Sequence, residues 1–157
     1  MDSKNIQIGN TRYAYYELPN PGKAKMLLLH GMLVESHCFE ALTEDLKANY
    51  HLILLDLKGH GKSDNGKSYD ADYTNDAIAA DLLAFQQAVI QEPFHLVGYS
   101  LGGQYSLKFA GTHPELVKSV TLIDSAPALS TKGIFRILFA LFTTPKFFKN
   151  KEHVYRH

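Results

Sequence analysis

Four short apolar runs separated by helical patterns limit the possible folds of this 157-residue chain more than any other feature. The runs are Met26 to His30 (MLLLH), Leu52 to Asp56 (LILLD), Phe94 to Tyr99 (FHLVGY) and Val117 to Asp124 (VKSVTLID). A continuous apolar run such as MLLLH is typical of a strand that is covered on both faces of a parallel sheet. Strands that alternate with helices form right-handed βαβ units. The pattern therefore predicts an α/β fold with a mostly parallel sheet and helices on both faces.

The other predicted elements fit this architecture. Two further strands, Asn5 to Ile8 and Arg12 to Leu18, flank a Gly9-Asn10 turn and predict an antiparallel hairpin at one edge of the sheet. One predicted helix extends from Ser36, its expected N-cap, to Ala48. A second begins after a Thr74 cap and has an apolar stripe of Ile78, Leu82, Phe85 and Val89. A third extends from Leu101 to His113. Ligands in such sheets bind beyond the carboxyl ends of the strands. The polar residues expected at those ends are His30, Asp56, Ser100 and Asp124.

Residues 98–102 have the pattern G-x-S-x-G and lie between a predicted strand and a predicted helix. A sharp turn at such a junction holds the serine in a strained backbone conformation and lifts its hydroxyl above the sheet. Gly98 and Gly102 suit the turn because the backbone before and after the serine must come close together. The pattern predicts that Ser100 is a nucleophile, and the alternative is a plain strand-to-helix turn with a capping serine.

A serine that attacks a carbonyl carbon needs hydrogen-bond donors for the oxyanion that forms. The backbone N–H of Leu101 is one expected donor, because the first N–H groups of a helix have no partner within the helix. The second donor is expected from the loop after the MLLLH strand, through the N–H of Met32. We expect the side chain of His30, next to Gly31, to brace that loop by hydrogen bonds rather than to take part in the chemistry.

Four motifs occur in order along the chain: a strand followed by His30-Gly31, the loop from Asp56 to Ser63, the G-x-S-x-G motif with Gly103, and the run from His113 to Val117. With these motifs the chain resembles the α/β-hydrolase superfamily, and within it the esterases, C–C bond hydrolases and cofactor-free haloperoxidases. The resemblance extends from about Ile6 to Asp124. It implies a serine hydrolase that acts on ester or similar acyl bonds without a cofactor.

The loop from Asp56 to Ser63 is rich in Gly, Lys, Asp and Ser, but it lacks the GxxxxGK[ST] pattern of a phosphate-binding loop. The resemblance implies a structural role in which Asp56 ties down the turn, and Gly59 and Gly61 permit it. His60 is then expected to brace the loop rather than to act as a base.

In this superfamily the catalytic triad runs in the order Ser, then Asp or Glu, then His. The resemblance implies an acid after a cap insertion and a histidine after the last strand. We expect this chain to lack both, as a hydrolase core truncated after the sixth strand. Asp124 is an alternative acid, because some branches of the superfamily place their acid after this strand. Residues 1–127 are expected to form the core, and residues 128–157 are expected to begin a helical cap or lid.

Composition argues against several other classes of protein. The chain has 16 basic and 16 acidic residues without a basic stripe, so nucleic acid is not an expected partner. Its 8 histidines have no metal-ligand spacing, and no metal is expected. Cys38 is the only cysteine and is expected to be buried or half-buried. A single cysteine and an N-terminus without an apolar run favour a cytoplasmic location.

The most apolar segment, Gly133 to Phe142, is much shorter than the ~20 residues of a membrane span, so no span is expected. The expected partner is a small-molecule substrate with an apolar part, and the oligomeric state is left open. Two alternatives stand beside the enzyme. One is a non-catalytic binding module that keeps the fold without the triad, and the other is attachment to a membrane surface through Gly133 to Phe148.

Overall fold

The computed structural model of the chain describes residues 2–126, 133 and 139. The strands are β1 (Ser3–Ile8), β2 (Thr11–Leu18), β3 (Lys25–Leu29), β4 (His51–Leu55), β5 (Phe94–Tyr99) and β6 (Val117–Ile123). The α-helices are α1 (Glu40–Leu46), α2 (Tyr69–Asp72), α3 (Asn75–Phe85) and α4 (Leu101–Thr112). Short 3-10 turns lie at Ser36–Phe39 and Pro114–Leu116, and a π-helical turn at Gln86–Ile90 continues α3.

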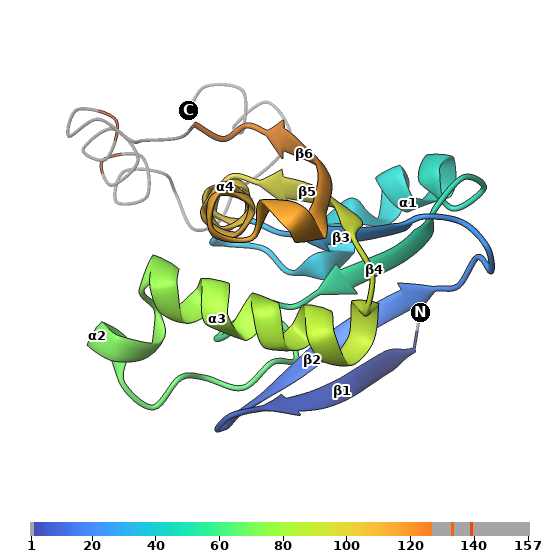
Figure 1. Ribbon diagram of the computed structural model, residues 1–157. Coiled ribbons are helices and arrows are strands. Elements are labelled where there is room, and N and C mark those ends of the chain that lie inside the picture. Colours follow the sequence, from blue (N-terminus) through green and yellow to red (C-terminus); the bar gives the residue numbers. More distant parts are fainter. Residues whose placement is uncertain (1, 127–132, 134–138, 140–157) are drawn as a thin grey trace, which may run out of the picture. The chain divides into compact units, whose positions relative to one another are not determined.

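The strands form one sheet in the order β1-β2-β4-β3-β5-β6 (Figure 1). β3 is parallel to β4 and to β5, and β5 is parallel to β6. β1 and β2 form an antiparallel hairpin, and β2 is also antiparallel to β4. The predicted α/β fold, with a mostly parallel sheet and an antiparallel hairpin at its N-terminal edge, is confirmed.

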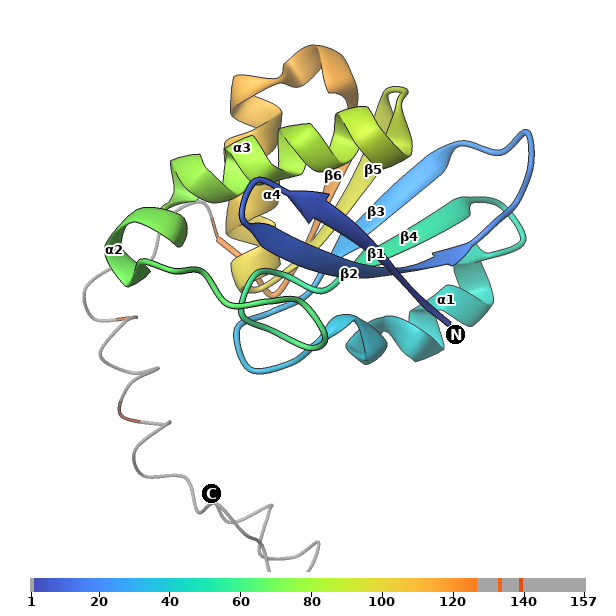
Figure 2. The same cartoon turned by 90° about the horizontal axis from the view of Figure 1, so that it is seen from below.

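Helices cover both faces of the sheet, as predicted. α3 and α4 lie on one face and α1 lies on the other (Figure 2). Successive residues of a strand point to opposite faces, so β3, β4 and β5 each contribute to two cores. Leu27 of β3 belongs to the core that contains Phe85 and Phe109, whereas Leu28 packs in a second core with Phe39. Burial on both faces explains why these strands are continuous apolar runs in the sequence.

The hairpin and the helix with a Thr74 cap form as predicted. Ile8 pairs with Thr11 across the Gly9-Asn10 turn. The hydroxyl oxygen of Thr74 accepts a hydrogen bond of 3.1 Å from the N–H of Ala77 at the start of α3. The predicted apolar stripe faces the core, and its fully buried members are Ile78, Leu82 and Phe85.

Two predictions for the segment after β3 are wrong. Ser36 is not an N-cap, because its hydroxyl has no hydrogen-bond partner among the described residues. Its backbone N–H instead donates a hydrogen bond of 3.0 Å to the carboxylate of Asp56. Cys38 is exposed rather than buried or half-buried. In a 3-10 turn residues three positions apart share a face, so Ser36 and Phe39 point inward and Cys38 points outward.

The chain divides into two compact units, Met1–Pro127 and Ala128–His157. Only Gly133 and Phe139 of the second unit are described. The predicted helical lid and the predicted membrane-surface segment therefore fall almost wholly outside the described residues and stay predictions. Within the part of the chain that the structure describes, no helix has the length and apolar character to cross a membrane.

Candidate active site

The carboxyl ends of the four parallel strands lie at one edge of the sheet and carry polar residues. His30, Asp56 and Asp124 directly follow β3, β4 and β6, and Ser100 directly follows β5. Ligands of open α/β sheets bind beyond this edge. The fold therefore brings four of the predicted polar residues to the side of the sheet where a site is expected.

Ser100 joins β5 to α4 in a backbone conformation that residues other than glycine rarely adopt. Its φ is +50° and its ψ is −112°. Such a conformation costs of order 1–3 kcal/mol and persists only where the surroundings impose it. The N–H of Ser100 donates to the carbonyl oxygen of Ile123 at 2.9 Å, and its carbonyl oxygen accepts from the N–H of Gly103 at 3.0 Å. The turn is therefore held by both β6 and α4.

The two glycines of the motif allow the backbone to pass close to the turn. A Cβ atom on Gly98 would lie 2.5 Å from the Cα of Gly103, and one on Gly102 would lie 2.5 Å from the carbonyl carbon of Leu29. Real Cβ atoms essentially never approach other heavy atoms below 3.0 Å. The N–H of Gly102 also donates to the carbonyl oxygen of His30 at 3.1 Å. The start of α4 is thus packed directly on the end of β3.

Gly31, in the loop after β3, lies against Ser100. A Cβ atom at this glycine would be 3.3 Å from the Cβ of Ser100 and 3.0 Å from two ring carbons of Tyr99. Met32 follows Gly31 in the chain, and Leu101 follows Ser100 as the first residue of α4. The two predicted oxyanion donors therefore belong to the residues that follow this close contact, and their role stays a prediction.

His30 is fully buried and connects two loops. Its Nδ1 lies 2.7 Å from the carbonyl oxygen of Gly31, and its Nε2 accepts a hydrogen bond of 2.9 Å from the N–H of Leu57. An accepting Nε2 carries no proton, so the neutral ring has its proton on Nδ1 and donates it to Gly31. Burial lowers the pKa of His30, because it disfavours the charged ring. His30 thus braces the loop as a neutral side chain.

Asp56 is fully buried and holds the turn that follows β4. One carboxylate oxygen accepts from the N–H of Ser36 at 3.0 Å, and the other accepts from the N–H of Lys62 at 2.9 Å. Gly61 has a φ of +53°, and a Cβ atom there would clash with the carboxylate of Asp56, most closely with Oδ2. A carboxylate inside the loop opposes binding of a phosphate, which agrees with the structural role implied for this residue.

His60 belongs to the same turn and contacts the loop after β3. Its Nδ1 lies 3.1 Å from the carbonyl oxygen of Lys58, and its Nε2 lies 2.5 Å from the carbonyl oxygen of Met32. The rings of His60 and His30 are 5.1 Å apart. The sequence indicates a bracing histidine here but not its partner, because Met32 is 28 residues away in the chain.

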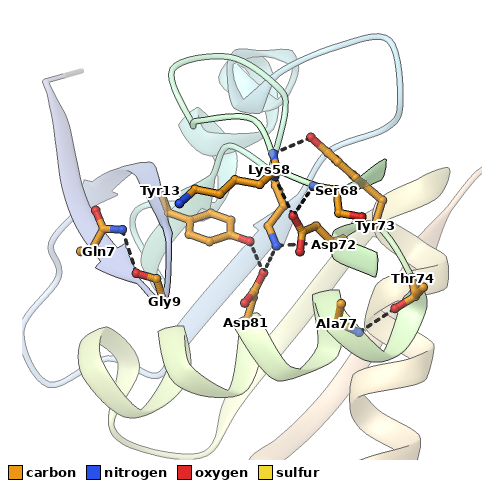
Figure 3. Close-up of polar contacts among 12 residues, drawn as sticks. Gln7, Gly9, Tyr13, Lys58, Ser68, Asp72, Tyr73, Thr74, Ala77 and Asp81 are labelled. Atoms are coloured by element: carbon orange, nitrogen blue, oxygen red, sulfur yellow. Dashed lines mark hydrogen bonds and ion pairs between the residues drawn. The ribbon is translucent and has the colours of Figure 1, made fainter. Parts of the chain in front are cut away.

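The side chain of Lys58 anchors this turn to α3. Its Nζ lies 2.7 Å from a carboxylate oxygen of Asp81 and donates to the carbonyl oxygen of Asp72 at 3.2 Å. The hydroxyl of Tyr13, on β2, donates to the same Asp81 oxygen at 2.5 Å (Figure 3). Burial raises the pKa of Tyr13, and the hydrogen bond to Asp81 raises it further. Nothing in the local sequence signals this cluster, because its members come from distant segments.

Asp124 lies beside Ser100, on the neighbouring strand end. Tyr99 pairs with Ile123, so Asp124 is the next residue in register with Ser100. Asp124 has a φ of +47°. It is exposed. Among the residues that the structure describes, no group of three or more His, Cys, Asp or Glu could hold a metal ion.

Sequence reasoning missed Ser125, which lies against Gly103. The hydroxyl of Ser125 donates to the carbonyl oxygen of Ser100 at 2.8 Å. A Cβ atom on Gly103 would lie 2.5 Å from the Cβ of Ser125. Gly103 therefore leaves room for a side chain that supports the turn, and a single serine after a strand has no local pattern that could have revealed it.

Comparison with known proteins gives one consistent family. The model of the alpha/beta hydrolase fold family matches residues 25–150. Lipase 3 of Moraxella sp. is 33% identical over 148 residues, which are 92% of this chain and 46% of the lipase. Pimeloyl-[acyl-carrier protein] methyl ester esterase of Neisseria meningitidis is 33% identical over 106 residues, which are 68% of this chain and 38% of the esterase.

Solved structures agree with these relatives. The crystal structure of a membrane phospholipase A superposes with a TM-score of 0.73 at 32% identity, and the match covers 80% of this chain and 40% of that protein. The chain thus spans less than half the length of the curated relatives it matches.

Proposed function

Because the chain belongs to the alpha/beta hydrolase fold family, we propose that it carries the nucleophile, Ser100, of a serine hydrolase that cleaves ester or similar acyl bonds. Its relatives include proteins named as lipases and esterases. The observation that carries the proposal is the strained turn at Ser100, which is held by β6 and α4 and lies against Gly31. Strain at one serine between a strand and a helix is the arrangement that exposes a nucleophile.

The proposed reaction has two steps. The oxygen of Ser100 bonds to the acyl carbon, its proton passes to a base, and the carbonyl oxygen becomes an oxyanion held by the N–H groups of Met32 and Leu101. Collapse of this intermediate breaks the bond to the leaving alcohol, which takes up the proton. Water then attacks the acyl-enzyme in the same way and releases the acid and Ser100.

The base of this reaction is proposed to come from the part of the fold that lies beyond the described residues. His30 and His60, the imidazoles described at this edge, are both engaged by backbone groups. Asp124 is the candidate acid, because it is in register with Ser100 and is exposed beyond the end of β6. Without a base the hydroxyl of Ser100 is a poor nucleophile, so the proposed reaction depends on one.

The loop after Gly31 supports a substrate with an apolar part. Met32 is 52% exposed, Leu33 is 72% exposed and Val34 is 38% exposed. Three successive exposed apolar side chains next to a proposed nucleophile suit the acyl or alcohol group of a small-molecule ester. We also propose a cytoplasmic location, because the exposed thiol of Cys38 is best preserved in a reducing compartment.

A covalent fluorophosphonate probe tests the proposed nucleophile. The expected result is labelling of the chain at Ser100, located by mass spectrometry of the labelled peptide and abolished in Ser100→Ala. The chain should also hydrolyse p-nitrophenyl butyrate slowly, and more slowly after the same substitution. Labelling at another residue, or no labelling above that of Ser100→Ala, would favour the alternative of a non-catalytic binding module that keeps the fold.

A further inference from the structure

The two peptide groups that flank the Cα of Met32 are each held by a histidine ring. Nδ1 of His30 lies 2.7 Å from the carbonyl oxygen of Gly31, and Nε2 of His60 lies 2.5 Å from the carbonyl oxygen of Met32. We propose that His60 is a positioning residue that, together with His30, fixes the direction of the Met32 N–H. This inference rests on the proposed function, in which that N–H stabilises the oxyanion.

Peptide planarity connects these contacts to the N–H of Met32. In a trans peptide group the C=O and the N–H point in opposite directions and turn together. The carbonyl of Gly31 and the N–H of Met32 belong to the same group, so the bond from His30 restrains that N–H from one side of the Met32 Cα only. The next group contains the carbonyl of Met32, and the bond from His60 fixes its rotation about the Met32 Cα. With both groups held, the backbone angles of Met32 have no free rotation left.

The loop has little other restraint at this point. Met32 and Leu33 are 52% and 72% exposed, so their side chains contribute little packing to hold the backbone. Loops of this kind are mobile unless hydrogen bonds fix them. The contact from His60 is therefore the restraint that keeps the second peptide group in place.

His60 is itself held on a fixed part of the fold. Its Nδ1 lies 3.1 Å from the carbonyl oxygen of Lys58. The side chain of Lys58 is only 6% exposed, and its Nζ lies 2.7 Å from Asp81 of α3 (Figure 3). Lys58, two residues before His60 in the same turn, thus ties the segment that carries His60 to a helix that covers the sheet.

Nitrogen-15 relaxation of the full chain tests the restraint directly, without any need for activity. In the unaltered protein the order parameters of the Met32 and Leu33 N–H groups are expected to be near the rigid value of about 0.85. In His60→Phe, which has a ring but no donor, they should fall below about 0.6. His95→Phe is the matched control, because His95 contacts Ser119 Oγ and not the loop after β3, and it should leave both values unchanged.

Two further variants separate positioning from general destabilisation. His60→Gln places an amide N–H near the position of Nε2 and should restore the order parameters. His60→Asn places its amide near Nδ1, toward Lys58, and should resemble His60→Phe. Thermal unfolding of each variant shows whether it is folded at the temperature of the measurement. Equal order parameters in His60→Phe and the unaltered protein would overturn the proposal, and so would recovery in His60→Asn but not in His60→Gln.

The rate of fluorophosphonate labelling at Ser100 gives a second readout. A misdirected oxyanion donor is expected to slow labelling about 10- to 100-fold in His60→Phe, with recovery in His60→Gln. Unchanged labelling in His60→Phe would contradict the link to the oxyanion. If the unaltered chain is not labelled at all, the proposed function of Ser100 fails, while the order parameters still decide whether His60 positions the loop.

Discussion

The hydroxyl of Ser125 donates a hydrogen bond of 2.8 Å to the main-chain carbonyl oxygen of Ser100. The same carbonyl accepts from the N–H of Gly103, and the N–H of Ser100 donates to the carbonyl of Ile123. Residues at and just after the end of β6 therefore hold the strained serine together with the start of α4. Because the strained conformation is stable only while these contacts last, they lead to the first prediction.

Gly103→Ala should destabilise the protein and loosen the turn at Ser100. The new Cβ would lie 2.5 Å from the Cβ of Ser125 and 3.1 Å from the carbonyl oxygen of Gly98. Overpacking of this kind typically costs about 1–3 kcal/mol. Urea denaturation of the variant should show a loss of stability in this range. The double variant Gly103→Ala with Ser125→Gly removes the main clash and should recover part of the loss. If the effects of the two substitutions on stability are additive, the side chains at positions 103 and 125 do not contact each other, which would contradict the prediction.

Gly102→Ala and Gly111→Ala should have opposite effects although both lie in α4. A Cβ on Gly102 would lie 2.7 Å from the carbonyl oxygen of His30, and neither backbone can move without separating α4 from β3. We expect a loss of about 3 kcal/mol or more. A Cβ on Gly111 would meet nothing within 4 Å, so the higher helix propensity of alanine should stabilise the protein by about 0.5–1 kcal/mol. Urea denaturation of both variants checks the pair, and equal losses would contradict it.

The sequence predicted those parts of the fold that depend on local pattern. The strands and the Thr74 cap are encoded by apolar runs and by a capping residue next to its helix, and the Ser100 turn is encoded by glycines two positions on either side. Ser36 shows where local pattern fails. Its N–H is satisfied by Asp56, 20 residues away, so the side chain is not needed as a cap.

The side chains that hold the backbone of the candidate site could not be predicted from the sequence, for the same reason. His60 contacts the carbonyl of Met32, and Ser125 contacts the carbonyl of Ser100, each over more than 20 residues. Both contacts are made to backbone atoms, which carry no residue-type signal. Sequence reasoning therefore predicted the proposed nucleophile and its glycines but not the side chains that hold them.

Lys58→Met should cost much more stability than Lys4→Met. Lys58 is 6% exposed, and its removal leaves the Asp81 carboxylate without its cation in a largely buried position. Because Asp81 keeps 22% exposure and a hydrogen bond from Tyr13, we expect a loss of about 2–3 kcal/mol, below the range of fully buried pairs. Lys4, which pairs with Glu17, is 53% exposed, so Lys4→Met should lower the free energy of unfolding by less than about 1 kcal/mol. Chemical denaturation at neutral pH measures both, and equal losses would mean that the Lys58 pair adds nothing beyond a surface pair.

Stability should fall below pH 6.5 because of His30. Burial lowers the pKa of His30 in the folded protein from its ordinary value of 6.5, and the accepting Nε2 loses its hydrogen bond from Leu57 when it is protonated. The unfolded chain therefore takes up a proton first as the pH falls. The contribution of His30 to the free energy of unfolding is complete above pH 6.5 and is lost as the pH falls through the pKa of the folded state. The free energy of unfolding then changes by up to about 1.4 kcal/mol per pH unit.

His30→Asn isolates this effect. Its amide can still donate to the carbonyl of Gly31, but it does not titrate. Urea denaturation of both proteins between about pH 7.5 and pH 5.5 gives their free energies of unfolding. As the pH falls, this free energy should decrease more steeply for the unaltered protein, with a difference in slope that corresponds to the uptake of up to one proton on unfolding. Burial acts to raise the pKa of Glu17, but its bonds with Lys4 and His51 lower it overall from the ordinary value of 4.5. Its contribution to stability is therefore lost only below pH 4.5, outside this interval. Parallel curves for the two proteins would mean that His30 is not held in its neutral form by the fold.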